Sequence, residues 1–449
     1  MNMEEYMTIK KLHQAYDQES ITPAGLIEEI IKKAEAYSDK NIWITGPDMS
    51  FIDKYLKKLG ERDYEKKPLW GIPFAIKDNI DMEGLPTTAA CPKYSYIATE
   101  SATSVSRLIE AGAIPIGKSN LDQFATGLVG VRSPYGEVHN AIRDEMISGG
   151  SSSGSAVAVA LDLAVFALGT DTAGSGRVPA ALNHLIGYKP PRGSWPSKGV
   201  VPACASLDCV TVMAKAMEDI RLVDSIVKGY DPGDRWSREI IEKEAPRDMN
   251  FIIPRKDPVF YGPYAEDYHR AWDTTLGKIK AAGYSVKKED CDFYQEAASL
   301  LYGGPCVAER WADLGEFITH NGDDIFPVTK EVLMTGFRSD YTAAFLYKVQ
   351  HLLADYKRMA VNQLKDSLLI FPTCGGTYSR EEVRNNPIET NSNMGRYTNH
   401  CNLLDLCAVD IPGINAKEDL PFGITLFAPF DEQRKLLKAA EEIISLQMS

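Results

Sequence analysis

Short apolar runs alternate along the chain with stretches of helical spacing. Thr22-Pro23 precedes apolar residues at 26, 27, 30, 31 and 34, which predicts a capped amphipathic helix. Buried strands are predicted at 69–76, 113–116 and 164–168, and helices at 103–111 and 155–164. This alternation is typical of an α/β fold with a large, mainly parallel or mixed sheet and helices on both faces.

The second half of the chain continues the pattern. A helix at 264–282, ended by Gly283, precedes a strand at 284–287. Turn-forming residues at 231–234 mark a candidate subdomain boundary, and 375–395 are predicted to be a long polar connection. We expect residues 1–60 to form a helical region that packs on the core, and residues 61–449 to form the principal domain.

Charge and hydropathy exclude two classes of protein. The net charge of −13 argues against a nucleic-acid binder, which needs a basic face. The most apolar stretch, 156–168, is too short to span a membrane and contains Asp162. In so acidic a protein, an anionic ligand has to be held by specific local cations.

The cysteines indicate a reducing compartment. The eight cysteines form neither a C-x-x-C pair nor a cluster with zinc-ligand spacing, so we expect free thiols, no metal ion and no cofactor. Residues 1–11 are acidic from the start and lack the apolar stretch of a signal peptide. These features predict a cytoplasmic protein.

Two motif matches do not fit their surroundings. Residues 112–119 (GAIPIGKS) match a phosphate loop, but a helix is predicted before the first glycine and a strand after it, the reverse of what the loop needs. Residues 150–154 (GSSSG) match the nucleophile elbow of Ser-His-Asp hydrolases, centred on Ser152. No good strand precedes them, and the late histidines (269, 320, 351 and 400) lie in no suggestive loop, so this hypothesis is the weaker one.

Lys77 ends an apolar run, GIPFAIK. Burial disfavours the ammonium form of a lysine, and a pKa shift of about 3 units costs about 4 kcal/mol. Such a shift yields a neutral amine near pH 7, which is a general base. The alternative is a structural ion pair with Asp78 or another carboxylate.

Two serine- and glycine-rich segments add candidate chemistry. Residues 148–155 (SGGSSSGS) open directly onto an apolar helix, which a flexible linker would not do. Residues 169–177 (GTDTAGSGR) follow a strand, and successive amides in such a turn converge to bind an oxyanion, with Ser175 placed as a nucleophile. Taken singly, a linker and an ordinary tight turn remain alternatives.

Together the three segments resemble the amidase signature family, and the resemblance extends over about residues 20 to 430. The family's triad is the lysine of its GIPxxxKD segment, the first serine of GGSS and the serine of its GTDxxGSxR turn. These positions are Lys77, Ser151 and Ser175 here. The resemblance implies an α/β/α sandwich and a cis peptide bond before Ser151.

The resemblance also implies a proton relay. Lys77 takes a proton from Ser151, and Ser151 takes one from Ser175, which attacks the amide carbonyl. The implied oxyanion hole consists of the amides of Thr172, Ala173, Gly174 and Ser175. Asp171 and Arg177 are expected to brace the turn and not to react.

Five further stretches (118–136, 177–181, 199–209, 397–405 and 420–426) are similar to the amidase domain of allophanate hydrolases. The similarity implies a homodimer that hydrolyses allophanate, a ureido carboxylate made from urea by a biotin-dependent carboxylase, to ammonia and N-carboxycarbamate. Those hydrolases place a tyrosine and an arginine eight residues apart on the substrate, and Tyr302 and Arg310 match this spacing. An arginine holds a carboxylate through two parallel bonds.

Two departures leave alternatives open. Ala205 stands where many allophanate hydrolases have an arginine, which affects anion recognition. Full-length enzymes continue into a C-terminal domain linked to decarboxylation, whereas this sequence ends at Ser449, so it is either shortened or relies on spontaneous or separately supplied decarboxylation. The alternatives are another ureido amide (biuret or carboxybiuret) as substrate, membership of a tRNA-dependent transamidation complex, and a catalytically silent scaffold.

Overall fold

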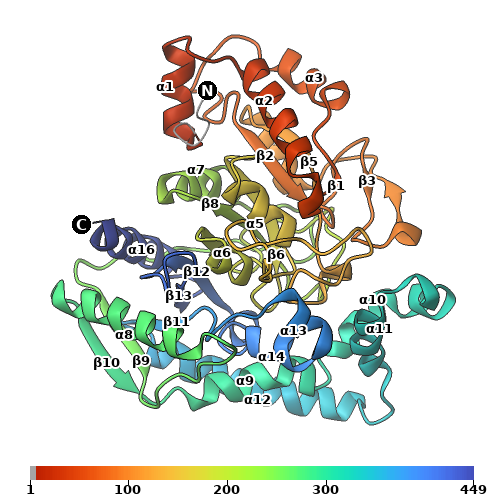
Figure 1. The fold of residues 1–449 in the computed structure, drawn as a ribbon. Coiled ribbons are helices and arrows are strands. Elements are labelled where there is room, and N and C mark those ends of the chain that lie inside the picture. The colour runs from red at the N-terminus through yellow and green to blue at the C-terminus, as the bar shows by residue number, and fades with distance from the viewer. Residues whose placement is uncertain (1–6, 449) are drawn as a thin grey trace.

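A mixed sheet of 11 strands runs through the part of the chain that the computed structural model describes, residues 7–448 (Figure 1). Its order is β1-β5-β2-β6-β8-β7-β12-β13-β11-β9-β10. The strands are β1 (Trp43–Thr45), β2 (Pro73–Lys77), β5 (Ile114–Ser119), β6 (Phe166–Asp171), β7 (Ile186–Lys189), β8 (Cys209–Ala214), β9 (Asn250–Pro254), β10 (Ser285–Glu289), β11 (Leu368–Pro372), β12 (Leu406–Pro412) and β13 (Gly423–Pro429). A separate pair consists of β3 (Pro86–Thr87) and β4 (Tyr96–Ile97).

Two groups of parallel strands lie within this sheet. β2 runs parallel between β5 and β6, and β9 runs parallel between β10 and β11, whereas the other neighbours are antiparallel. Every residue of β2, β5, β6 and β8 is buried, which explains their continuous apolar runs. The predicted mixed α/β fold is confirmed.

Helices cover both faces of the sheet (Figure 1). On one face α5 packs on β2, β6 and β8, next to α6; on the other α7 packs on β8, and α16 packs on β12 and β13. The helices are α1 (Ile9–Asp17), α2 (Pro23–Ala36), α3 (Met49–Lys58), α4 (Thr103–Glu110), α5 (Ser153–Ala160), α6 (Val178–Leu182), α7 (Met217–Val227), α8 (Ala265–Ala281), α9 (Asp292–Gly303), α10 (Val307–His320), α11 (Pro327–Met334), α12 (Ala343–Gln363), α13 (Arg380–Asn385), α14 (Glu389–Met394), α15 (His400–Leu403) and α16 (Gln433–Met448).

Local sequence explains several of these elements. The hydroxyl of Thr22 accepts a bond from the Gly25 amide and begins α2, as the Thr-Pro pair predicts. The rejection of the phosphate-loop match is confirmed, because residues 114–119 form the buried strand β5. A loop that wraps a phosphate with its amides is incompatible with a strand whose amides pair with its neighbours.

Two expectations differ from the structure. The stretch 375–395 is not simply a polar connection, since it contains α13 and α14, and α13 begins with a capping box between Ser379 and Glu382. The N-terminal region is not purely helical, because β1 pairs antiparallel with β5 at the edge of the main sheet. α13 and α14 are short and polar, and β1 has only three residues, so none of them shows the periodic pattern on which the predictions rely.

No helix within residues 7–448 combines the length and the apolar character that a membrane crossing requires. Residues 1–6, which bear on the prediction that a signal peptide is absent, lie outside the described residues.

Candidate active site

Lys77 is the last residue of β2 and is completely buried. Its Nζ lies 2.8 Å from Ser151 Oγ and 2.7 Å from Thr170 Oγ1. The parallel register of β2 and β6 pairs Ile76 with Leu168, so both strands end at the same edge of the sheet. This register brings the lysine to the base of the 169–177 turn.

The surroundings of Lys77 favour a neutral amine. Burial lowers the pKa of Lys77 to about 7, although the negative charges of Asp208, Asp122 and Asp171 oppose this effect. Within residues 7–448 no carboxylate oxygen lies within 4.0 Å of Nζ. Asp78, the partner in the ion-pair alternative, instead faces Lys118 Nζ at 3.3 Å.

Ser151 and Ser152 have different surroundings. The Gly150–Ser151 peptide bond is cis, as the family resemblance implies, and the Ser151 side chain faces Lys77. Ser152 Oγ instead donates to Thr170 O (3.2 Å) and accepts from Thr170 N (3.3 Å). Ser152 therefore fastens α5 to β6 and has no histidine partner among the described residues, which removes the basis for a nucleophile elbow.

The turn after β6 presents Ser175 and several unbonded amides. Among residues 7–448, no hydrogen bond uses Ser175 Oγ or the backbone amides of Thr172, Ala173 and Ser175. The Gly174 amide, the fourth predicted oxyanion donor, differs because it donates to Asp171 Oδ1 at 2.8 Å. The turn thus offers three uncommitted N–H groups beside the predicted nucleophile.

Asp171 and Arg177 form a buried, two-pronged ion pair beneath this turn. Arg177 Nε lies 2.9 Å from Asp171 Oδ2, and Nη2 lies 3.0 Å from Oδ1. Burial alone raises the pKa of Asp171, but the charge and hydrogen bonds of Arg177 outweigh it and hold the pKa below its usual value. The same carboxylate accepts from the amides of Gly174 and Gly176. This geometry fits the predicted bracing role.

We expect Asp171→Ala to lower the free energy of unfolding by about 3–5 kcal/mol, because it leaves the Arg177 guanidinium buried without a counter-charge. Chemical denaturation measures the change. The double variant Asp171→Ala/Arg177→Met, which removes both charges, should recover part of the loss. A single-variant loss below about 1 kcal/mol would contradict the bracing role.

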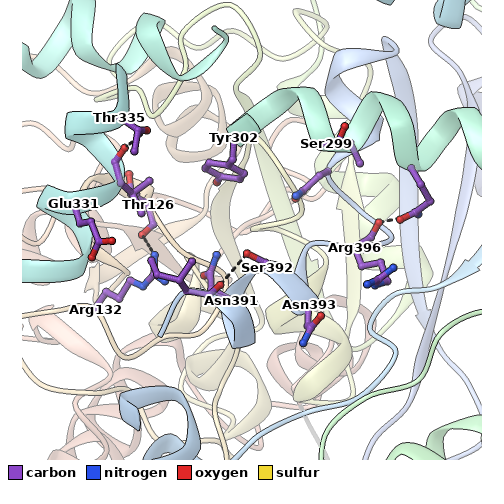
Figure 2. A pocket seen from close by; sticks show the side chains of 15 residues that line it. Thr126, Arg132, Ser299, Tyr302, Glu331, Thr335, Asn391, Ser392, Asn393 and Arg396 are labelled. Atoms are coloured by element: carbon purple, nitrogen blue, oxygen red, sulfur yellow. Dashed lines mark hydrogen bonds between the residues drawn. The ribbon is translucent and has the colours of Figure 1, made fainter. Parts of the chain in front are cut away.

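Tyr302 and Arg310, the residues predicted to hold the substrate, contact each other. Arg310 on α10 is 1% exposed; its Nη2 lies 3.3 Å from the Tyr302 hydroxyl on α9, and its Nη1 lies 2.9 Å from Thr126 Oγ1. Tyr302 and Thr126 line a cavity of about 610 Å³ (Figure 2), whereas Arg310 contacts both of them and is not itself a lining residue. Asn399, also on the wall, follows Thr398, whose hydroxyl donates to Ala173 O at 2.6 Å. No residue of the 169–177 turn lines the cavity itself, so Asn399 and Thr398 connect its wall to that turn.

Two residues of the site escape sequence reasoning. Thr170 accepts from Lys77, and the buried Asp208 accepts from the Thr172 hydroxyl and from the amides of Ala203 (2.7 Å) and Cys204 (3.1 Å). Burial raises the pKa of Asp208 to about 6. The position of Thr170 just before Asp171, on a strand that leads into a reactive turn, is the signal that could have identified it.

The described cysteines form no disulfide, and the described metal-binding side chains form no metal site. All eight cysteines are unpaired thiols. Within the described residues, no three or more His, Cys, Asp or Glu side chains gather where they would hold a metal ion.

Comparison with known proteins places this geometry in a family. The Amidase family profile matches residues 25–437. The urea amidolyase of Lachancea kluyveri is 38% identical over 88% of this chain, and the chain spans 22% of that protein. The solved Kluyveromyces lactis allophanate hydrolase superposes with a TM-score of 0.90 at 35% identity, over 98% of this chain and 72% of that one. A glutamyl-tRNA(Gln) amidotransferase subunit from Acidobacterium capsulatum is 29% identical over 88% of this chain and 89% of its own length.

The chain belongs to the amidase family, whose profile covers most of its length. The resemblance drawn from the three short segments is thereby confirmed.

Proposed function

We propose that the chain hydrolyses the terminal amide of allophanate to ammonia and N-carboxycarbamate, with Ser175 as nucleophile. The observation that carries the proposal is the 2.8 Å contact between Lys77 Nζ and Ser151 Oγ, in a buried place with no carboxylate in ion-pair range among the described residues. A lysine with a pKa of about 7 exists as a free amine in much of the population at neutral pH.

In the proposed relay, the Lys77 lone pair accepts the proton of Ser151, and an N–H of the amine donates to Thr170. Ser151 in turn accepts the proton of Ser175 as the Ser175 oxygen attacks the amide carbonyl. The same path returns a proton to the leaving ammonia. Water then attacks the acyl-enzyme, gives up a proton to the relay and releases the second product.

The link between Ser151 and Ser175 is not closed by a hydrogen bond in the ligand-free structure. Catalytic hydrogen bonds are often long without substrate and shorten in the complex. We assign the oxyanion to the uncommitted amides of Thr172, Ala173 and Ser175. Gly174 supplies the backbone conformation of the turn, since its φ of +128° favours glycine.

The choice of allophanate rests on Tyr302 and Arg310. A buried guanidinium beside a cavity favours a carboxylate-bearing substrate in a protein of net charge −13. The similarity to urea amidolyase and to allophanate hydrolase supports the same substrate. We also propose a cytoplasmic homodimer supplied by a biotin-dependent urea carboxylase, in keeping with the eight unpaired thiols.

Release of ammonia and CO2 from allophanate, biuret and acetamide, measured side by side, tests the substrate. Allophanate should be preferred, with little turnover of acetamide. A preference for biuret would change the substrate and keep the chemistry. Glutamine-dependent transfer of ammonia to a tRNA-bound amino acid would point to the transamidation role instead, and no turnover of any amide would point to a scaffold.

Arg310→Gln should raise the KM for allophanate at least about 30-fold, because it removes a buried cation. The kcat for allophanate and the rate on neutral biuret should change far less, since a ground-state contact affects KM. Steady-state kinetics on allophanate and biuret measure kcat and KM separately for each substrate. An equal loss on both substrates would contradict an anion-binding role.

A further inference from the structure

A second buried arginine lies close to Arg310 without an ionic partner. Arg132 is 2% exposed, and within residues 7–448 no carboxylate oxygen lies within 4.0 Å of either guanidinium. Arg177, equally buried, by contrast has an ionic partner in Asp171. Since a buried charge normally has a counter-ion, two unpaired cations in one place require an explanation.

The partners of both guanidiniums are neutral and meet at one residue. Arg132 Nη1 donates to Thr126 O (3.1 Å) and Nη2 to Pro387 O (2.6 Å), while Nε has no acceptor among the described residues. Arg310 Nη1 donates to the hydroxyl of the same Thr126 at 2.9 Å. Thr126 thus joins two positive groups and neutralises neither of them.

The nearest acidic groups are already engaged. Asp122 Oδ2 accepts from the amides of Val129 (3.1 Å) and Gly130 (3.0 Å), and Oδ1 accepts from the Arg132 amide (2.9 Å). Asp122 and Glu331 attract Arg132 only from beyond ion-pair distance. Glu331 is exposed on the cavity rim, so it remains hydrated and leaves the positive charge largely uncompensated.

Arg132 also lies on the wall of the 610 Å³ cavity. Figure 2 shows it beside Thr126, on the side of the cavity away from Arg396, with Tyr302 between the two ends. Arg132 on the wall is joined to Arg310 through Thr126, which makes this end of the cavity positive. A carboxylate at this end of the cavity faces Arg132 and lies in the field of both charges, so it supplies the missing counter-ion.

We propose that Arg132 is a specificity-determining residue that attracts and holds the carboxylate of the ureido substrate together with Arg310. The proposal rests on the proposed function and deepens it, because it predicts selection of anionic over neutral ureides by two arginines. A plain structural role is the competing explanation, since Arg132 also ties the Thr126 and Pro387 backbones together.

Two substitutions of Arg132 distinguish the effect of its charge from the effect of its hydrogen bonds. Arg132→Gln keeps N–H donors for the two carbonyls and removes the charge, whereas Arg132→Lys keeps the charge and loses the planar fork. Arg358→Gln is the control for charge removal, because Arg358 on α12 is exposed, pairs with Asp355 and does not line this cavity. Thermal unfolding of each variant shows whether the fold is retained.

The experiment pairs an anion with a neutral molecule of the same shape. Malonamate is allophanate with CH2 in place of NH, and malonamide is its neutral amide; calorimetry measures their binding, and steady-state assays use allophanate and biuret. Arg132→Gln should weaken malonamate binding and raise the KM for allophanate about tenfold or more, with malonamide and biuret changed less than about threefold. Arg132→Lys should give losses between those of the wild type and Arg132→Gln, and Arg358→Gln should match the wild type.

Equal losses on anionic and neutral ligands, or no loss on either, would overturn the role of Arg132. The proposed function fails separately. If the wild type binds malonamate through Arg132 and does not hydrolyse allophanate, the anion-binding role of Arg132 is supported and allophanate is not the substrate. If the wild type and Arg132→Gln hydrolyse allophanate equally well, allophanate is the substrate and Arg132 does not bind its carboxylate. Failure of the wild type both to bind malonamate and to hydrolyse allophanate would overturn both.

Discussion

Ser175→Ala is expected to reduce kcat/KM for allophanate by about 10⁴-fold or more, with the fold intact. The substitution removes the oxygen that attacks the carbonyl, and the other hydroxyls of the turn are already engaged, Thr170 with Lys77 and Thr172 with Asp208. Ser175 Oγ forms no hydrogen bond with any described residue, so its loss should change the free energy of unfolding by less than about 1 kcal/mol. Ammonia release and chemical denaturation measure the two quantities.

Ser152→Ala is the matched control for this prediction. Ser152 Oγ bonds to both backbone groups of Thr170, so its removal should cost about 1 kcal/mol of stability and leave activity within about tenfold. A serine-directed fluorophosphonate should label the wild type and the Ser152 variant, and peptide mass spectrometry should place the label on Ser175. Full activity in Ser175→Ala, or a label on Ser152, would reverse the assignment.

The sequence carried enough information to find the lysine and the turn, because both depend on local chemistry. A lysine at the end of an apolar run is unusual wherever the chain goes, and glycine-rich turns after a strand present their amides. What the sequence could not predict depends on distant contacts. Asp208 reaches Thr172 from a different segment, and the Gly174 amide is taken by Asp171 through side-chain geometry within the turn.

The same distinction explains the elements that were mispredicted. β1 has three half-buried residues, and its place in the sheet comes from pairing with β5, far away in sequence. α13 and α14 are six residues each and polar, so neither repeats an apolar position often enough to reveal a helix. Short elements held by tertiary contacts give weak periodic signals, whereas the long α8 was predicted within a residue of its bounds.

Lys77→Met is expected to lower kcat/KM for allophanate by about 10³- to 10⁴-fold, because it removes the base that starts the relay. In the wild type only the neutral amine accepts a proton. With a pKa of about 7, kcat/KM should rise as the pH increases through about 7 and level off above it. The residual activity of the variant should lack this rise.

The free energy of unfolding of Lys77→Met shows whether its lost activity reflects loss of the base or loss of the fold. Burial lowers the pKa of Lys77 from 10.5, so the folded state disfavours the ammonium that the unfolded chain retains. That cost is complete below about pH 7 and disappears as the pH rises towards 10.5. Lys77→Met should therefore be at least as stable as the wild type at pH 7, with a relative advantage that shrinks at higher pH.

Lys118→Met provides the contrast, since Lys118 is the equally buried lysine of the neighbouring strand β5 and is paired with Asp78. Its removal leaves the carboxylate of Asp78 buried without a counter-charge, so stability should fall by a few kcal/mol while the rise in kcat/KM near pH 7 remains. If Lys118→Met abolished that rise and Lys77→Met preserved it, the base would be misassigned. If both variants kept it, the titrating group would lie elsewhere, and Asp208, whose pKa is raised to about 6, would be the next residue to replace.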